Sequence, residues 1–471
     1  MLRRIEVKNF KSLKHLDYKC AKLNLLTGLN GAGKSSFVQS LLLLRALEKH
    51  IEKEYYEMPL HEIAADDGAT FDDLKYCYAK PEEKVEFGVD FDVNIGKGDR
   101  GQAIGHIARV IRPSVVHKGM IVAWNSECME ANDSLVESMF SLPPDSCDNS
   151  HVVSRPALPG SCELTIDDFE EQQEKEKLEL QAKSQMQKAM MQERPFVQDY
   201  QSLWKRANMI SAFRGRPQQI HHDNPKESWF MGARFNPEGS DVGGFLAAHG
   251  MECFLSQLPG EVNPLIFPGT DMHDVPVLWE NRKRTFLLEQ IQMWLNVISP
   301  GAKVAFEKVA IGSLELYVQT VSYGDKKFKP ENVGFGVSDI LPVLTSVLTS
   351  HPGDILIIEN PEVHLHPKGQ AKMGELLARA ATYGVQLFVE THSDHVINGI
   401  RVAVADKLIQ PGDVNIAFFE RREHGVSHDD GSVETETYAE VCNIKMDKRG
   451  FLSEYPEGFM DEWNNQLLEL S

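Results

Sequence analysis

"GLNGAGKSS", residues 28–36, is the stretch that decides the fold class, because it has the spacing G-x-x-x-x-G-K-[ST]. A short apolar run (22–28) leads into it, and a strongly helical segment (37–51) follows. Glycines in such a turn let backbone N–H groups and the positive end of the next helix point at phosphate oxygens. The context therefore predicts a strand, a phosphate-binding loop and a helix, and it disfavours a chance glycine-rich loop.

The residues of this loop have separate roles toward a nucleotide. Lys34 is expected to reach the β- and γ-phosphates, and the Ser35 hydroxyl is expected to ligate Mg²⁺. ATP and Mg²⁺ are therefore the expected cofactors. The loop residues predicted to bind nucleotide are Asn30, Gly31, Ala32, Gly33, Lys34, Ser35 and Ser36.

A second segment, "LIIENPEVHLHP" (356–367), fits the other half of such a site. Its apolar run ends in Glu359, where a P-loop ATPase needs a carboxylate on the water shell of the metal. Alone, Glu359 would be an ordinary surface carboxylate at a strand end, but the phosphate loop favours the metal role. The next predicted strand, in "LFVETHS" (387–393), ends in Glu390 and His392, and a histidine there can contact a γ-phosphate.

A third segment, "ENVGFGVSDILPVL" (331–344), is a glycine-rich turn with a serine that opens a helix. Such a turn is typical of a second phosphate-binding helix N-terminus, to which Gly336 and Ser338 would contribute. The chain then has two anion-binding helix starts, one near each end. This arrangement favours a dimer in which the nucleotide is sandwiched between two chains.

The organisation of the chain follows from its apolar patterns. After about residue 337, helix and buried strand alternate, which is the βαβ rhythm of a parallel sheet. Short alternating runs predict an antiparallel β-subdomain between residues 84 and 166 and a hairpin over 303–323. The pattern of residues 285–298 predicts an amphipathic helix, and that of 414–420 predicts a strand. A charged segment (167–192) predicts a helix that either packs on the body or contacts a partner. The predicted domains are the first part of an ATPase head (1–90), an insertion (91–284) and the second part of the head (285–471).

Composition narrows the class of protein. The 471 residues have a net charge of −20, with 42% apolar and 25% charged residues. The charge disfavours a protein that coats nucleic acid by electrostatics alone, although a local basic patch stays open. No apolar run reaches the ~18 residues that a membrane span needs, and no signal-peptide pattern begins the chain. Seven scattered cysteines favour free thiols in a reducing compartment, so a cytoplasmic location is expected.

In these motifs the sequence resembles the ABC-type ATPase heads related to SMC and RecF proteins, and more closely the AAA-21/DUF3696 ATPases of bacterial anti-phage defence. The first two segments look like the Walker A and Walker B motifs of that family, and "GFGVSD" (334–339) stands where ABC proteins have their signature sequence. "DKRGFLSEYPEGFMDEWNNQLLEL" (447–470) is similar to the C-terminal tail of the family. The resemblance covers about residues 1–80 and 285–471. It implies the α/β class, with an ABC-type P-loop ATPase head, an antiparallel β-subdomain and an inserted helical and loop region.

The resemblance implies an ATPase that regulates rather than cuts, because the chain has no recognisable nuclease motif. Similar stand-alone ATPases of the PARIS and Septu systems pair with a separate effector nuclease, and a phage-encoded protein would be the trigger. A sandwich dimer, or a hexamer built as a trimer of dimers, is the expected assembly. The alternative is an SMC- or RecF-like ATPase of DNA repair or chromosome structure, which the shortness of the predicted helix over 167–192 disfavours.

One position departs from the family pattern. Relatives have Asp-Glu or Glu-Glu at the end of the metal-binding strand, whereas this chain has Glu359 followed by Asn360. Asn360 can orient a water molecule but cannot take its proton. Glu362, Glu390 and His392 therefore stay open as candidates for the catalytic base or for positioning water, and hydrolysis is expected to be slow.

Five further side chains have two interpretations each. The resemblance places Asp73 in a loop that senses Mg²⁺ and contacts nucleotide, and an ordinary turn aspartate is equally expected. His364 and His366 are assigned to a loop that faces the dimer partner rather than to a metal site. Arg214 and Arg216 have the chemistry to bind phosphate, but a surface loop with ordinary salt bridges is the favoured interpretation.

Overall fold

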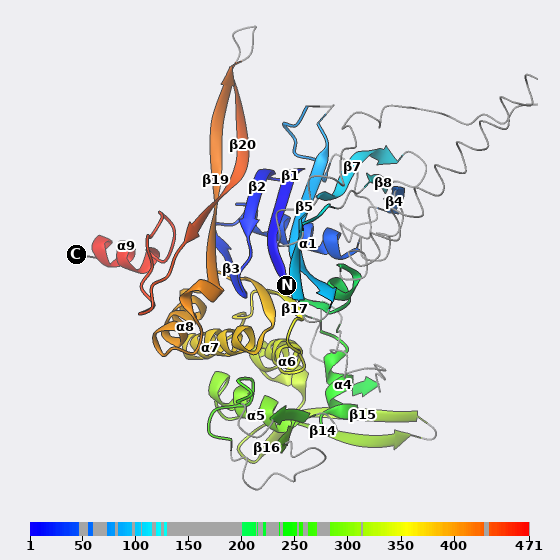
Figure 1. The fold of residues 1–471 in the computed structure, drawn as a ribbon. Coiled ribbons are helices and arrows are strands. Elements are labelled where there is room, and N and C mark those ends of the chain that lie inside the picture. The colour runs from blue at the N-terminus through cyan, green and yellow to red at the C-terminus, as the bar shows by residue number, and fades with distance from the viewer. Residues whose placement is uncertain are drawn as a thin grey trace, which may run out of the picture.

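The computed structural model describes residues 1–46, 55–59, 73–80, 83–96, 99–104, 106–114, 119–123, 127–129, 200–212, 214, 220–222, 235, 239–251, 254–257, 262–270, 283–311, 314–427 and 433–470. Figure 1 shows two large sheets side by side, a group of helices below one of them, and a smaller β region at the lower end. Within these residues, no helix combines the length and the apolar character needed to cross a membrane.

The central sheet has the strand order β10 (Ala207–Ile210), β17 (Ile355–Glu359), β18 (Gln386–Glu390), β3 (Leu23–Gly28), β19 (Val414–Ser427) and β20 (Val433–Ile444). Five of these strands are parallel and only β20 is antiparallel to its neighbour. β3 and β18 are buried along their whole length, as expected for strands of a parallel sheet that is covered on both faces. The predicted α/β class is confirmed.

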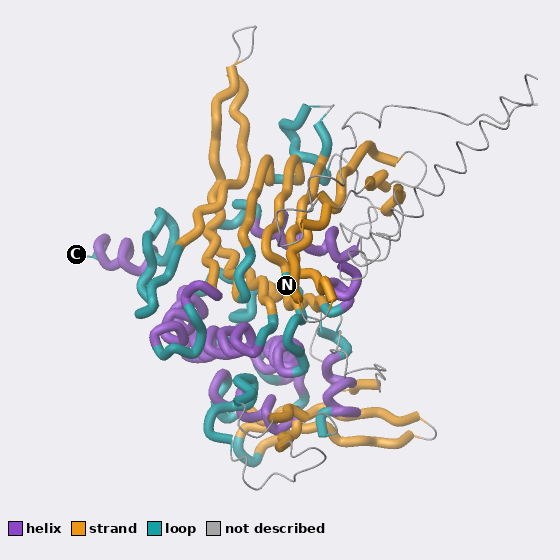
Figure 2. The backbone as a smooth tube through the Cα atoms, in the orientation of Figure 1, coloured by secondary structure: helices purple, strands orange, loops and turns teal. Residues whose placement is uncertain are grey.

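Helices alternate with these strands, as the pattern along the sequence predicts: α6 (Phe335–Leu348), α7 (Pro367–Tyr383) and α8 (Asp394–Ala405). Figure 2 shows them gathered together on one side of the strands. Side chains cap two of them, because His366 Nδ1 accepts the Lys368 N–H and Ser393 Oγ accepts the His395 N–H. The caps hold the two loops that follow β17 and β18.

The second large sheet is antiparallel, with the order β2 (Leu13–Lys19), β1 (Leu2–Phe10), β5 (Val85–Gly96), β7 (His106–Ser114), β8 (Gly119–Ala123) and β4 (Tyr55–Pro59), and with β6 (Asp99–Ile104) and β9 (Glu127–Met129) beside it. The antiparallel β-subdomain predicted between residues 84 and 166 is confirmed up to Met129, and the rest of that range lies outside the described residues. The first two strands of the chain also belong to this sheet. α1 (Lys34–Ala46) packs on both sheets. Its Phe37 ring lies 4.7 Å from Tyr18 of one sheet and 6.3 Å from Phe388 of the other.

The lower region is built on a hairpin of β14 (Ala302–Ile311) and β15 (Leu314–Tyr323), which confirms the hairpin predicted over 303–323. A helix expected from residue 285 begins instead at Leu287, because the preceding residues pair with β12. The other elements are β11 (Ile220–His222), α4 (Val242–His249), β12 (Phe254–Gln257), β13 (Lys283–Phe286), α5 (Leu287–Ile298), β16 (Lys326–Phe328), α9 (Glu462–Glu469) and the 3-10 turns Pro330–Asn332 and Pro411–Asp413.

Two features differ from the sequence-based picture. β10 lies inside the segment assigned to an insertion, yet it pairs in parallel with β17 at the edge of the central sheet. β19 and β20 form a long hairpin that rises above the sheet in Figure 1, whereas the sequence predicts only a strand at 414–420. The domain limits remain a prediction. The charged segment 167–192 and Arg216 lie outside the described residues.

Candidate nucleotide site

The phosphate loop lies where β3 leads into α1, as predicted. Gly31 and Gly33 have φ angles of 76° and 106°, a left-handed backbone that favours glycine. A Cβ at Gly33 would lie 2.6 Å from the Cβ of Ala439 on β20. The β19–β20 hairpin therefore packs directly onto the loop, which leaves no room for a side chain at this position.

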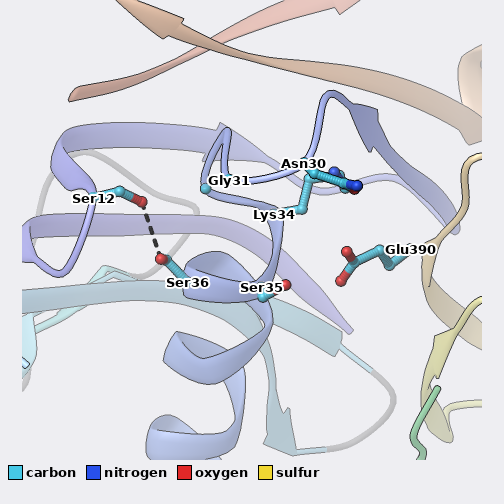
Figure 3. Close-up of a pocket in the computed structure, with 8 residues that line it drawn as sticks. Ser12, Asn30, Gly31, Lys34, Ser35, Ser36 and Glu390 are labelled. Carbon is cyan, nitrogen blue, oxygen red and sulfur yellow. Dashed lines mark hydrogen bonds between the residues drawn. The ribbon is translucent and has the colours of Figure 1, made fainter. Parts of the chain in front are cut away.

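A cavity of about 220 Å³ opens beside this loop (Figure 3). The residues that line it are Ser12, Asn30, Gly31, Gly33, Lys34, Ser35, Ser36 and Glu390. All the loop residues predicted to bind nucleotide line this cavity except Ala32, whose side chain is buried. The cavity is therefore bounded by the phosphate loop on one side and by the end of β18 on the other.

Lys34 is the cation of this cavity. Its side chain is only 3% exposed, and Nζ donates to the carbonyl oxygens of Gly28 and Leu29 at 2.9 and 2.8 Å. Burial lowers the pKa of Lys34, and the nearby carboxylate of Glu390 opposes that shift. Because an ammonium bonds more strongly to phosphate oxygens than to neutral carbonyls, Lys34 can exchange these partners for a triphosphate.

Two carboxylates end neighbouring strands at the edge of the cavity. Glu359 of β17 is in register with Glu390 of β18. Burial and then the charge of Glu359 raise the pKa of Glu390, whereas Lys34 and a hydrogen bond with Ser35 lower it. Glu390 lines the cavity, while Glu359 accepts the Ala212 N–H at 2.9 Å. The sequence favours Glu359 as the metal residue, and the geometry adds Glu390 beside Ser35.

These residues fit ATP with Mg²⁺. A hydroxyl group and one or two carboxylates beside a phosphate site are typical partners of Mg²⁺ in nucleotide enzymes. When bound, Mg²⁺ would offset negative charge on the phosphates. Ser35 would hold the ion, with Glu359 and Glu390 on its water shell.

Arg214 overturns the favoured sequence-based interpretation, a surface loop with ordinary salt bridges. Its side chain is 8% exposed, and Nη2 donates to the carbonyl oxygens of Glu359 and Asn360 at 2.9 and 3.2 Å. Burial lowers the pKa of Arg214, and Asp339, Glu362 and Glu359 oppose this shift in that order. The guanidinium group therefore braces the end of β17. The interpretation was wrong because the hydrogen-bond partners of Arg214 among the described residues, Glu359 and Asn360, are more than a hundred residues away in the sequence.

The turn after β17 holds the candidates for activating water. Asn360 has a φ of 44°, and its N–H donates to the Glu390 carbonyl oxygen at 2.7 Å. Glu362 Oε1 accepts the His392 N–H at 2.9 Å. Asn360 Oδ1 and Glu362 Oε2 are buried and have no hydrogen-bond partner in the described part of the chain. Burial raises the pKa of Glu362, and burial with the charge of Lys34 lowers that of His392.

The second glycine-rich turn begins α6 and does not line the cavity at Lys34. Gly336 packs closely on the turn after β17, because a Cβ there would lie 2.7 Å from the His364 carbonyl oxygen. His364 Nε2 lies 3.6 Å from an Asp339 oxygen. Ser338 Oγ is buried, again without a hydrogen-bond partner among the described residues. The same residues contain no group of three or more His, Cys, Asp or Glu arranged as a metal site.

Two residues near the β1–β2 turn change the predicted site. Asp73 is exposed, acts electrostatically on Lys11 and does not line the cavity, so its metal role remains a prediction. Ser12 does line the cavity, and its Oγ lies 3.0 Å from Ser36 Oγ. No motif signals Ser12, because a serine in a turn after a strand has no spacing that ties it to the phosphate loop.

Family models match three parts of the chain. An AAA ATPase domain matches residues 1–228, an AAA domain described as a putative AbiEii toxin of a Type IV TA system matches 254–398, and DUF3696, a protein of unknown function, matches 409–470. Over residues 1–228 and 254–398 the chain is therefore similar to AAA-type ATPase domains. No curated protein sequence matches it significantly.

The chain also has matches among solved structures of Smc heads. The SmcHead bound to the C-winged helix domain of ScpA has a TM-score of 0.43 at 12% identity, over 95% of this chain and 98% of that chain. The Smc head domain with an extended coiled coil from Pyrococcus furiosus, bound to the C-terminal domain of ScpA, has a TM-score of 0.42 at 13% identity, over 100% and 99%. The SMC head domain from Thermotoga maritima has a TM-score of 0.36 at 8% identity, over 94% and 99%.

Proposed function

We propose that this chain binds and slowly hydrolyses ATP as the regulatory subunit of a cytoplasmic anti-phage defence system, in which it controls a separate effector nuclease. The observation that carries the ATPase part is the cavity that sets Lys34 and Ser35 opposite Glu390. The match of residues 254–398 to a model described as a putative AbiEii toxin supports a setting in defence. A phage-encoded protein would be the trigger.

Each group at the site has a separate task in hydrolysis. Lys34 offsets charge on the β- and γ-phosphates, and Glu359 orients the water shell of Mg²⁺. Glu362 takes the proton of the attacking water, since its buried carboxyl has a raised pKa and one oxygen without a partner in the described ranges. Asn360 orients that water through Oδ1. The backbone N–H of His392 donates to Glu362, and this hydrogen bond positions His392.

The second glycine-rich turn supports a dimer with shared nucleotide. Ser338 and the start of α6 do not line the cavity at Lys34 in their own chain. In the proposed assembly they face the phosphates held at Lys34 of a second chain, and three such dimers would form a hexamer. A nucleotide shared in this way couples ATP binding to pairing, and pairing sets whether the effector is held.

The test uses the purified full-length chain, with and without the product of a neighbouring effector gene. The chain alone should hydrolyse ATP and leave DNA and RNA intact, and cells should resist phage only when both genes are present. Nuclease activity from this chain alone, lost in Lys34→Ala, would refute the division of labour. Strong stimulation of ATP hydrolysis by DNA would favour the SMC- or RecF-like alternative instead.

A further inference from the structure

A second cavity lies beside the phosphate loop, on the side of the β19–β20 hairpin. It measures about 200 Å³ and is lined by Ser12, Gly31 and Ala32, and by Arg421, Thr437, Tyr438 and Ala439 of the hairpin. Ser12 and Gly31 also line the cavity at Lys34, so the two cavities adjoin at the loop.

The strand order shows which part of a nucleotide this second cavity would meet. β3 leads into the phosphate loop and lies between β18 and β19. Glu390 ends β18 and marks, with Ser35, the end of the site where Mg²⁺ and the γ-phosphate would lie. The α-phosphate and the nucleoside of a bound nucleotide would then extend away from Glu390, across Gly31, toward the hairpin.

Arg421 is the charged residue that lines this cavity. It is opposite Ala439 in the hairpin, and residues directly opposite in an antiparallel pair point to the same face. Ala439 contacts the loop at Gly33, so Arg421 also points to the loop side. Arg421 is exposed, and it makes no hydrogen bond or ion pair with any described residue.

The next residue, Arg422, provides a contrast. It lies on the opposite face of the hairpin, where its guanidinium pairs with Glu440 and Glu420, each at 2.7 Å. The two adjacent arginines therefore differ in one respect that matters here: Arg422 is neutralised by carboxylates, and Arg421 faces the cavity without a partner in the described part of the chain.

The sizes of the two cavities also fit one ligand that spans both. Pockets for drug-sized molecules measure about 300–1,000 Å³. The cavity at Lys34 and the cavity at Arg421 are each below that range, at about 220 and 200 Å³, and together they fall within it.

We propose that the second cavity binds the nucleoside half of the nucleotide, with the planar Arg421 guanidinium group against the base. This inference rests on the proposed function, because it assumes a triphosphate at Lys34. A guanidinium group stacks on aromatic faces, which a lysine ammonium does less well because it is compact and strongly hydrated. Arg421 is thus a specificity residue that lets the site distinguish a nucleotide from a bare polyphosphate.

The experiment compares binding of ATP and of inorganic tripolyphosphate by calorimetry, with Mg²⁺ present. The parent protein should bind ATP about tenfold more tightly than tripolyphosphate, as expected for one stacked base. Arg421→Ala should lose most of that tenfold difference and leave tripolyphosphate binding unchanged. Arg421→Lys should behave like Arg421→Ala, and the matched control Arg422→Ala should behave like the parent.

Three outcomes would overturn this inference while leaving ATP binding at Lys34 in place. The first is a parent protein that binds ATP and tripolyphosphate with equal affinity. The second is an Arg421→Ala variant in which the affinity for both ligands falls by the same factor. The third is an Arg421→Lys variant that keeps the parental affinity for ATP, which would indicate a phosphate contact. Failure of the parent to bind either ligand would instead refute the proposed function. Because Arg421 is exposed, thermal unfolding of the variants should match that of the parent.

Discussion

Two glycine-rich turns of this protein each open a helix, but they lie in different environments. At α1, Lys34 and Ser35 line a cavity with Glu390 on its far side. At α6, Gly336 packs against His364, and Ser338 Oγ is buried with no partner in the described ranges. Similar local sequences therefore have different environments. The first turn lines a phosphate site together with other residues of the same chain. In our proposal, the second turn contacts phosphate only when the nucleotide of another chain lies against it.

The largest effect is expected at the first turn. The Lys34→Ala variant should bind ATP at least about 100-fold more weakly than the parent. The reason is that the triphosphate loses a charge-assisted hydrogen-bond partner in a site that is partly shielded from water. Isothermal calorimetry measures this, with exposed Lys19→Ala as the control. Unchanged ATP affinity in Lys34→Ala, in a variant that still folds, would break the assignment of this turn.

The turn after β17 should control turnover rather than binding. Glu359→Gln should abolish hydrolysis, because the water shell of Mg²⁺ loses its carboxylate, while Glu362→Gln and His392 substitutions should slow it about tenfold to 100-fold. Asn360→Ala should do less than any of these. Steady-state ATPase rates with Asn360→Ala as the most damaging change would reverse the proposed roles.

The second turn should matter for pairing and not for binding to one chain. Ser338→Arg places a large cation where the proposed partner's phosphates and loop approach, so ATP-dependent dimers should weaken by about tenfold or more while ATP affinity of a single chain is kept. Native mass measurements with and without ATP test this, and Gln410→Arg controls for added surface charge. If Ser338→Arg pairs as the parent does, the two turns are not complementary.

Arg214 connects the end of β17 with the second glycine-rich turn, since it contacts the Glu359 carbonyl oxygen and acts on Asp339 in α6. Arg214→Met leaves the carbonyl oxygens of Glu359 and Asn360 without their donor, and should lower the free energy of unfolding by about 2 kcal/mol. Arg214→Lys should recover part of this loss, because it keeps one donor. Urea unfolding measures both variants, and a parent-like stability of Arg214→Met would contradict the bracing role.

The smallest effect concerns pH. Burial raises the pKa of Glu390 above the ordinary value of about 4.3. An ionised carboxylate favours Mg²⁺, so Mg²⁺-dependent ATP affinity should be kept at neutral pH and lost as the pH falls through that raised pKa. Glu390→Gln should flatten this dependence at lower affinity. A parental affinity that is constant down to pH 4.3, or a Glu390→Gln profile equal to the parent's, would contradict this role.

The sequence alone determined the phosphate loop, the βαβ alternation after residue 337 and the antiparallel β-subdomain. Each of these depends on neighbours close in the chain: glycine spacing, the period of apolar residues, and caps such as His366 and Ser393. Local signals also located Glu359, Glu390 and His392 at strand ends, and parallel pairing of β17 with β18 places the first two side by side.

Only the tertiary structure decided the rest of the site. Ser12 lies in the β1–β2 turn, Arg214 follows β10 and Arg421 lies in β19, and each reaches the phosphate loop or the end of β17 from outside the motifs that mark the site. The edge position of β10, the length of the β19–β20 hairpin and the close contact at Gly33 depend on which strands pair, and that choice is set by burial of whole sheets rather than by any local motif. For this reason Arg214 resembles a surface residue in the sequence and is a buried brace in the fold.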